Sequence, residues 1–405
     1  MNYELFLAKR FRATKKYKSS ISTPIIKIAI TAISLGMVMM LVTVATGIGL
    51  KHKIREKLSL FNGHVSIVNY DNNTSETSQF PISKEQDFYP NFTKVKGVKT
   101  VQAYAIKAGL IRTEKDFEGI VLKGVDHTYD WSRLQEYLID GKLPKIDSVS
   151  RTHEVLISKI LSERLGIQLG DKFDTYFIKN AVNKLPNRRV FNVCGIYNTG
   201  FIDFDKSYVL GDIKHIQKLN KWNTEEIGGF EIFLEDFDQI EVLGSAIYNE
   251  IDSTLNSKTI LEMYPAIFEW LQLFDKNISI IIGIMILVAG INMITALLVL
   301  ILERTQTIGI LKSMGANNWS IRKIFLYNAS YIIFKGLFIG NAIGIILLLV
   351  QKYFELVQLD PETYYVSTAP VVINLWHILL LNIGTLALCL LMLLIPSIII
   401  TKISP

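Results

Sequence analysis

Hydrophobic residues are concentrated in four long stretches of this chain, at residues 24–50, 277–302, 325–350 and 371–400. Each stretch is nearly free of charged residues and is at least 26 residues long. Because an apolar helix of about 20 residues crosses the hydrocarbon core of a bilayer, all four are predicted to be transmembrane helices. The first stretch far exceeds the roughly 7–15 apolar residues of a signal peptide, so we interpret it as an uncleaved anchor.

Residues 51–270 have the mixed pattern of a globular domain, long enough to bury its own core. Paired β-rich runs with turns between them alternate with segments of helical periodicity. Strands are expected at 101–110, 119–124, 172–178 and 190–197, and helices at 158–165 and 237–251. The predicted fold class is an α-helical membrane protein with four transmembrane helices and a large mixed α/β, two-subdomain periplasmic domain inserted between helices 1 and 2.

The formal net charge of +6 is unevenly distributed along the chain. Residues 51–270 contain 28 Lys and Arg against 31 Asp and Glu, so the basic excess lies in the membrane-flanking parts. Basic residues flank the cytoplasmic ends of membrane helices, which places residues 1–23, 303–324 and 401–405 in the cytoplasm. The domain and the short loop 351–370 are then periplasmic. A slightly acidic domain argues against nucleic acid as a partner.

Motifs of catalytic or metal sites are missing from the sequence. It has no GxxxxGK[ST] phosphate-binding loop, no HExxH motif and no GxSxG motif. Its two cysteines, Cys194 and Cys389, lie in the domain and in the fourth predicted span, and its six histidines are scattered singly. We therefore expect no catalytic residues, no metal and no cofactor bound by this chain, although an unmarked catalytic site in the domain stays open.

The third span contains Gly336, Gly340 and Gly344, two overlapping GxxxG steps. Small residues on one face of a membrane helix let another helix approach closely, so this face is expected to be a helix packing surface. The alternative is that glycine is simply common in membrane helices. Lys335 in the same span either has a function or extends to the headgroups, and the sequence leaves its role open.

The cytoplasmic segment ILERTQTIGILKSMGA, residues 301–316, predicts a short amphipathic helix between two spans. An apolar stripe on such a helix either docks into a groove of a partner protein or lies on the lipid headgroups. The pattern alone does not decide between them.

Residues 296–326, ALLVLILERTQTIGILKSMGANNWSIRKIFL, resemble the signature of ABC-transporter permeases of the MacB/FtsX type. The matching residues are Glu303, Arg304, Ile308, Gly309, Ile310, Leu311, Lys312, Gly315, Ala316, Ile321, Arg322, Ile324 and Phe325. Further blocks, such as EVLISKILSERLGIQLGDKF and FNVCGIYNTG, resemble in order those of the lipoprotein-releasing (Lol-type, LolC/LolE-like) transmembrane subunits. The resemblance covers nearly the whole chain.

This resemblance implies a permease that works with a separate cytoplasmic ABC ATPase subunit (LolD-like), which binds ATP and Mg. The residues implied in ATPase coupling are Glu303, Arg304, Ile308, Gly309, Leu311, Lys312, Met314 and Gly315, with Ile308, Leu311 and Met314 as anchors buried against the ATPase. It also implies a second permease subunit as a homo- or heterodimer partner, lipoprotein substrates, and the inner membrane of a bacterium with an outer membrane.

Two further sites follow from the same resemblance. Acyl chains are expected in a cavity lined by Met37, Met40, Leu41, Val44, Ile284, Met285, Val288 and Met293. A hairpin hook at residues 179–189, with Pro186, Arg188 and Arg189, is expected to capture a periplasmic lipoprotein carrier. The alternatives are a MacB-like exporter, which usually carries its ATPase in the same chain, and an FtsX-like protein that signals to cell-wall hydrolases.

Overall fold

The computed structural model describes residues 3–13, 22–72, 77–112, 117–177 and 186–402. Its chain divides into two compact units. The helical unit comprises Met1–Lys51, Trp270–Gln358 and Thr368–Pro405, and the sheet domain comprises His52–Glu269 and Leu359–Ser367. The sheet domain is thus inserted after the first span, and it also includes nine residues from the loop before the last span.

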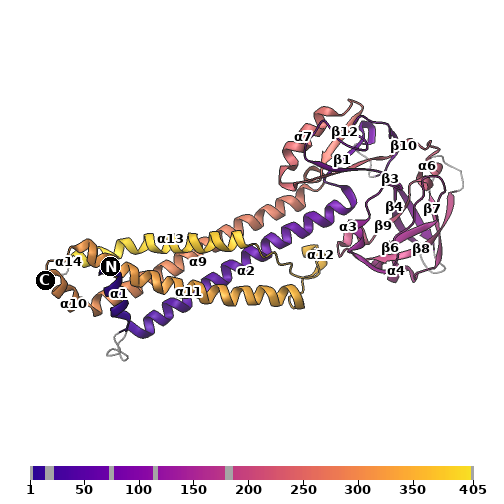
Figure 1. The fold of residues 1–405 in the computed structure, drawn as a ribbon. Helices are drawn as coiled ribbons and strands as arrows, with labels where there is room; N and C mark the ends of the chain where they lie inside the picture. Colours follow the sequence, from indigo (N-terminus) through magenta and orange to yellow (C-terminus); the bar gives the residue numbers. More distant parts are fainter. Residues whose placement is uncertain (1–2, 14–21, 73–76, 113–116, 178–185, 403–405) are drawn as a thin grey trace. The chain divides into compact units, whose positions relative to one another are not determined.

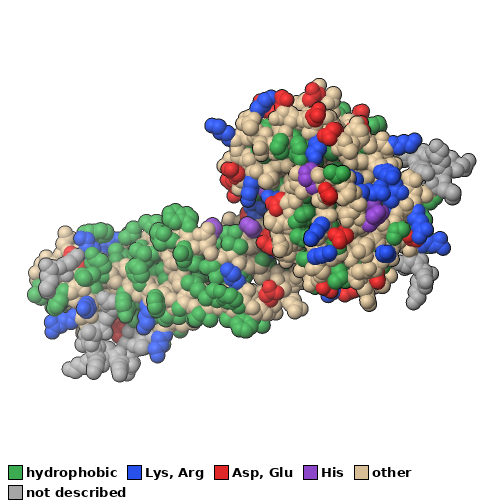
Figure 2. All heavy atoms as spheres, turned by 45° about the vertical axis from the view of Figure 1, so that its right-hand side comes forward, with side chains coloured by type: hydrophobic (Ala, Val, Ile, Leu, Met, Phe, Trp, Pro, Cys, Tyr) green, Lys and Arg blue, Asp and Glu red, His purple; other side chains and the backbone are tan. Residues whose placement is uncertain are grey.

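Four long helices form the core of the helical unit and run side by side (Figure 1). They are α2 (Ser22–Asn62), α9 (Pro265–Glu303), α11 (Asn318–Phe354) and α13 (Leu375–Ser397). All four are long and apolar enough to cross a membrane. Figure 2 shows apolar side chains gathered over the surface of this unit, as expected for helices that face lipid or other apolar helices.

The first of these helices continues to Asn62, beyond the predicted end of the span at residue 50. This extension is amphipathic, and Ile54, Leu58 and Phe61 on its apolar face are buried in the sheet domain. Charged residues on the other face of this extension end the apolar stretch near residue 50, although the helix itself continues to Asn62. Short helices complete the element set outside the sheet: α1 (Tyr3–Ala13), α10 (Thr305–Ser313), α12 (Pro361–Tyr364) and α14 (Ile399–Lys402).

Glycines let α11 approach α2 closely. A Cβ atom added at Gly336 would lie 2.8 Å from Ile33 Cβ, and one at Gly340 would lie 2.7 Å from Met37 Cβ. At Gly344 the nearest atom is Leu41 Cδ1, at 2.8 Å. The three glycines therefore line one helix–helix contact within the chain.

A pair of amides joins α11 to α13. Asn341 Nδ2 donates to Asn382 Oδ1 at 2.7 Å, and Asn382 Nδ2 donates back to Asn341 Oδ1 at 3.1 Å. Both side chains also donate to carbonyls of their own helices, those of Leu337 and Ile378. The amide groups of both side chains are therefore hydrogen-bonded inside the bundle and are not exposed without partners to the hydrocarbon of a membrane.

The sheet domain is built on one large mixed sheet of ten strands, with the order β12-β1-β11-β3-β4-β9-β6-β8-β5 and with β7 pairing β3 and β8. The strands are β1 (Val65–Asn69), β3 (Val98–Arg112), β4 (Phe117–Val125), β5 (Leu138–Gly141), β6 (Glu154–Ser158), β7 (Lys172–Phe177), β8 (Asn187–Tyr197), β9 (Tyr208–Asp212), β11 (Gly229–Leu234) and β12 (Leu255–Thr259). β2 (Ile82–Ser83) and β10 (Glu226–Ile227) form a separate small sheet. The helices are α3 (Ser132–Gln135), α4 (Lys159–Leu165), α5 (Ile202–Asp205), α6 (Lys214–Asn220), α7 (Ile240–Glu250) and α8 (Ile260–Met263).

The predicted mixed α/β class of this domain is confirmed, and both expected strand pairs are present. β3 pairs with β4 from Tyr104↔Val125 to Arg112↔Phe117, and β7 pairs with β8 from Lys172↔Asn192 to Phe177↔Asn187. The expected division of the domain into two subdomains stays a prediction, since the domain groups as one compact unit on the large sheet. Charged side chains of both signs are mixed over its surface (Figure 2).

Candidate functional site

The segment between the second and third spans contains α10, followed by a sharp turn into α11. Gly315 ends the helix with φ of 86°, a left-handed conformation that glycine adopts readily. The side chain of Asn317 then caps α11 by accepting a hydrogen bond from the backbone nitrogen of Trp319 at 3.2 Å. The segment is therefore a defined helix–turn–helix and not an extended linker.

The two faces of α10 have different surroundings. Ile308 is only 1% exposed and belongs to the same hydrophobic core as Ile321 and Phe325, against which Leu311 is packed. On the opposite face, Ile310 is 60% exposed and Met314 is 77% exposed. A partner that covers this segment would meet Ile310 and Met314, so the expectation that Ile308 anchors the ATPase needs correction: its side chain packs within its own chain.

Two basic residues of the permease-like signature bind the C-terminal end of the bundle. Lys312 Nζ donates to the carbonyl oxygen of Thr401 at 3.3 Å. Arg322 donates from Nε to Ser397 Oγ at 3.0 Å and from NH2 to the carbonyl of Leu394 at 3.2 Å. The carbonyl of Leu394 is among the last of α13, where helix carbonyls have no backbone partner within the helix, and Thr401 lies in the following short helix α14. The signature thereby ties the segment between the second and third spans to the fourth span.

The residues expected to line a lipid cavity occupy two environments. Met37, Met40, Leu41, Val44 and Met293 are buried within the helical unit, whereas Ile284 and Val288 are exposed and Met285 is partly buried. The exposed pair lies on α9, on a surface available to lipid or to another subunit. Their role in acyl-chain binding stays a prediction.

The expected carrier hook falls partly outside the described residues, because residues 178–185 are not among them. Its described end begins at the exposed Pro186 and enters β8. Arg188 pairs with Asp174 at 2.8 Å, and Arg189 NH1 donates to the carbonyl of Arg188 at 3.0 Å. In the described structure Arg189 has no ion-pair partner, and burial together with the nearby charge of Arg151 lowers its pKa.

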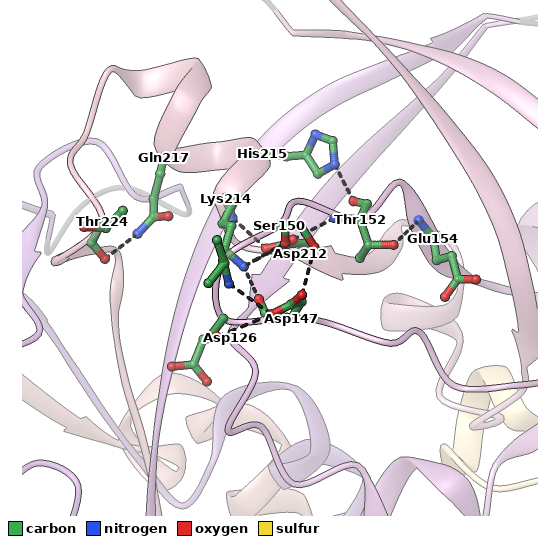
Figure 3. A network of polar contacts seen from close by, with 12 residues as sticks. Asp126, Asp147, Ser150, Thr152, Glu154, Asp212, Lys214, His215, Gln217 and Thr224 are labelled. Carbon is green, nitrogen blue, oxygen red and sulfur yellow. Dashed lines mark hydrogen bonds and ion pairs between the residues drawn. The ribbon is translucent and has the colours of Figure 1, made fainter.

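A dense polar network lies at the start of α6 (Figure 3). The carboxylate of Asp212 accepts hydrogen bonds from the backbone nitrogens of Thr152, at 3.0 Å, and Lys214, at 2.9 Å. Lys214 Nζ donates to the carbonyls of Asp147 and, at 3.2 Å, Ser150. These bonds hold the segment before β6 against α6, which is a structural role.

The structure brings together two histidines that the sequence analysis treated as isolated. The rings of His153 and His215 are 5.0 Å apart, and His215 Nε2 lies 2.7 Å from the carbonyl of Thr152. Burial lowers the pKa of His215 to about 3, so its ring is neutral and donates from Nε2. Among the described residues no cluster of three or more His, Cys, Asp or Glu side chains is arranged to hold a metal ion.

Comparison with known families gives matches over both units. Residues 28–247 match the MacB-like periplasmic core domain, and residues 279–405 match the FtsX-like permease C-terminal region. The chain belongs to the MacB-like periplasmic core domain family. With four helices able to span a membrane, it is a multi-pass membrane protein of the permease type.

Relatives in this family are similar over most of their length. One is the lipoprotein-releasing system transmembrane protein LolE of Haemophilus influenzae, 21% identical, with 100% of this chain and 98% of the relative covered. Another is the transmembrane protein LolC of Neisseria meningitidis, 22% identical, with 85% and 81% covered. Among solved structures, the periplasmic region of MacB from Actinobacillus actinomycetemcomitans aligns with 52% of this chain and 95% of its own, at 14% identity and a TM-score of 0.34.

Proposed function

We propose that this protein is a transmembrane permease subunit of an ABC transporter that extracts lipoproteins from the inner membrane of a bacterium with an outer membrane. The supporting observation is that relatives named for lipoprotein release align with 85% and 100% of this chain. The four apolar helices and the inserted sheet domain fit a protein that takes a lipid-anchored cargo at the membrane and passes it to a periplasmic carrier.

ATP hydrolysis belongs in this proposal to a separate cytoplasmic ATPase subunit, which binds ATP and Mg. The exposed Ile310 and Met314 on α10 are the contact for that subunit, since they lie four residues apart on one helix face. The tight packing of Ile308 and the bonds from Lys312 and Arg322 would carry a displacement of α10 into α11 and α13. The N-terminus, α10 and the C-terminus are then cytoplasmic, in keeping with their excess of basic residues.

The carrier is captured by the proposed hook at residues 179–189, whose described part begins at Pro186. Arg188 already pairs with Asp174, whereas Arg189 has no acidic partner among the described residues. Arg189 is therefore the residue that offers its charge to an acidic group of a carrier. Substituting Arg189 with Glu should weaken carrier binding more than substituting Arg188 with Glu, measured as carrier capture by the purified protein.

The function is tested with the full-length chain, its ATPase subunit and any second permease subunit reconstituted in proteoliposomes. The vesicles carry either a lipoprotein acylated at its N-terminal cysteine or the same protein without acyl chains. ATP and carrier should release the acylated form into the soluble fraction, and an ATPase variant unable to hydrolyse ATP should not. If ATP is hydrolysed and the acylated lipoprotein stays in the vesicles, the proposed function is wrong.

A further inference from the structure

The short loop between α11 and α13 has its tip in the sheet domain. Its two arms are joined by the bridge between Gln358 and Thr368, and Leu359 N donates to the carbonyl of Ser367 at 2.9 Å. Beyond this bridge, Leu359–Ser367 groups by its contacts with the sheet domain, whereas both arms group with the helical unit. The sheet domain therefore contacts a loop tip whose two ends continue along the chain into the third and fourth spans.

The tip has a defined conformation. Asp360 caps the short helix α12 by accepting hydrogen bonds from Glu362 N at 3.1 Å and from Thr363 Oγ1 at 2.8 Å. Tyr365 then ends α12 with φ of 59°, in the left-handed region that residues other than glycine seldom adopt. A conformation of this kind persists where surrounding contacts hold it.

Two contacts hold Tyr365 to the sheet domain. Its ring stacks on Phe201, with the ring centroids 5.0 Å apart and the planes at 18°. Its carbonyl oxygen accepts a hydrogen bond from Lys57 Nζ at 3.2 Å. Phe201 in turn stacks on Phe204, which contacts Phe61, so an aromatic series runs from the loop tip to the end of α2.

Lys57, which donates to the carbonyl of Tyr365, is fixed in place by burial and by a nearby carboxylate. It lies on the α2 extension and is 4% exposed, close to the fully buried carboxylate of Asp205. That carboxylate is fixed by Thr199 Oγ1, at 2.7 Å, and by Gly200 N, at 2.9 Å. A Cβ atom at Gly200 would lie 3.1 Å from Lys57 Nζ, so the absence of a side chain there leaves room for the ammonium group.

We propose that Lys57, Phe201 and Tyr365 form a loop clasp that transmits movement of the third and fourth spans to the sheet domain during transport. All three residues belong to the sheet-domain unit, and the loop tip that carries Tyr365 continues at both ends into the third and fourth spans. This inference rests on the proposed function, because it assigns the clasp to the transport cycle. Its three residues are positioning residues: they keep the loop tip attached to the sheet domain and are not assigned a contact with substrate.

The test separates coupling from assembly. Tyr365→Gly removes the stacked ring and leaves a residue that adopts positive φ readily, and Lys57→Met removes the ammonium while keeping an apolar side chain. In the reconstituted full-length system, both should lower the lipoprotein released per ATP hydrolysed roughly fivefold or more, the lower end of ordinary coupling between sites. Tyr365→Phe keeps the stack and should retain release. Lys206→Ala, which removes a long and exposed pair with Glu362 at 3.9 Å, is the matched surface control.

A second experiment reverses the loss. In a chain with Cys194 and Cys389 replaced by serine, Phe201→Cys and Tyr365→Cys remove the stack, and a short bis-thiol reagent then joins the two positions. Release per ATP should be low before joining and should recover after it, which mere destabilisation of the domain would not produce. Recovery without the reagent, or release that stays low after complete joining, would overturn the clasp. Failure of the unsubstituted chain to release lipoprotein would overturn the proposed function instead.

Discussion

The ammonium nitrogen of Lys123 lies 2.6 Å from Oε1 of Glu231, and both side chains are fully buried in the sheet domain. The same nitrogen donates to the carbonyl of Phe61 at 3.0 Å, one residue before the end of α2. Burial lowers the pKa of Lys123 and raises that of Glu231, while their mutual attraction opposes both shifts. The ion pair thus joins the end of the first span's helix to two central strands, β4 and β11.

Breaking this pair on one side should destabilise the sheet domain strongly. Lys123→Met or Glu231→Gln leaves the other group buried without its counter-charge, which costs about 3–5 kcal/mol in comparable pairs. The double variant Lys123→Met with Glu231→Leu should recover most of that loss, since it leaves neither charge behind. Hydrogen exchange of the β4 and β11 amides in the full-length protein measures the change. Single variants as protected as the unsubstituted chain would contradict the prediction.

The exposed face of α10 should carry ATPase binding. Ile310→Asp puts a charge in the middle of that face and should weaken binding by at least ~2 kcal/mol, or roughly 30-fold, as for a central interface residue. Capture of the ATPase subunit by the purified permease measures it. Val149→Asp, at an exposed site in the sheet domain, is the control and should leave capture unchanged. Equal capture by Ile310→Asp would remove this face from the interface.

Widening the glycine contact should loosen the helical unit. Gly340→Ala places a Cβ 2.7 Å from both Met37 Cβ and the carbonyl of Ser34, so α11 and α2 must move apart, at a cost of about 1–3 kcal/mol. Gly283→Ala and Gly384→Ala are matched controls, because a Cβ there meets no described atom within 4 Å. Thermal unfolding of the detergent-solubilised protein should separate Gly340→Ala from both controls. A common melting temperature for all three would argue that the contact is not tight in the membrane.

The sheet domain should lose stability in mild acid through two neutral histidines. Burial lowers the pKa of His64 to about 4 and that of His215 to about 3, whereas in the unfolded chain both titrate near 6.5. Below pH 6.5 the unfolded state therefore binds protons that the folded state does not, and stability falls until the folded pKa values are reached. Each pKa unit is worth about 1.4 kcal/mol, so each histidine contributes a few kcal/mol.

His215→Gln isolates one of these contributions. A glutamine amide is able to donate to the carbonyl of Thr152, as His215 Nε2 does, without binding a proton in acid. Unfolding of the domain followed between pH 7 and pH 4 should show a shallower loss for this variant. An unchanged pH slope would mean that His215 is already protonated, or exposed to protonation, in the folded protein.

Features set by local pattern were predictable, and features set by distant contacts were not. Four apolar stretches predict the four membrane helices, and Ser158 and Gly166 mark the ends of α4 as its cap residues. The amphipathic pattern of residues 301–316 predicts α10, but it shows apolar residues on both sides. Only the packing of α11 shows that Ile308 faces inward and Ile310 outward.

The same limit applies to the polar sites. Lys123 and Glu231 are 108 positions apart in sequence, and Lys57 and Tyr365 are 308 apart, so no local spacing relates them. His153 and His215 are distant in the sequence. Their rings come close in the structure because β6 and β9, which are not consecutive strands, pair in the sheet. Such pairs are products of topology.

The reciprocal amides of Asn341 and Asn382 restrict how this bundle is able to rearrange. Pulling α11 away from α13 would expose two carboxamides to hydrocarbon, where no water replaces the lost partners. In the proposed transport cycle, the third and fourth helices should therefore move as one body. Any lateral gate has to open along another seam, one bordered by the first or second helix.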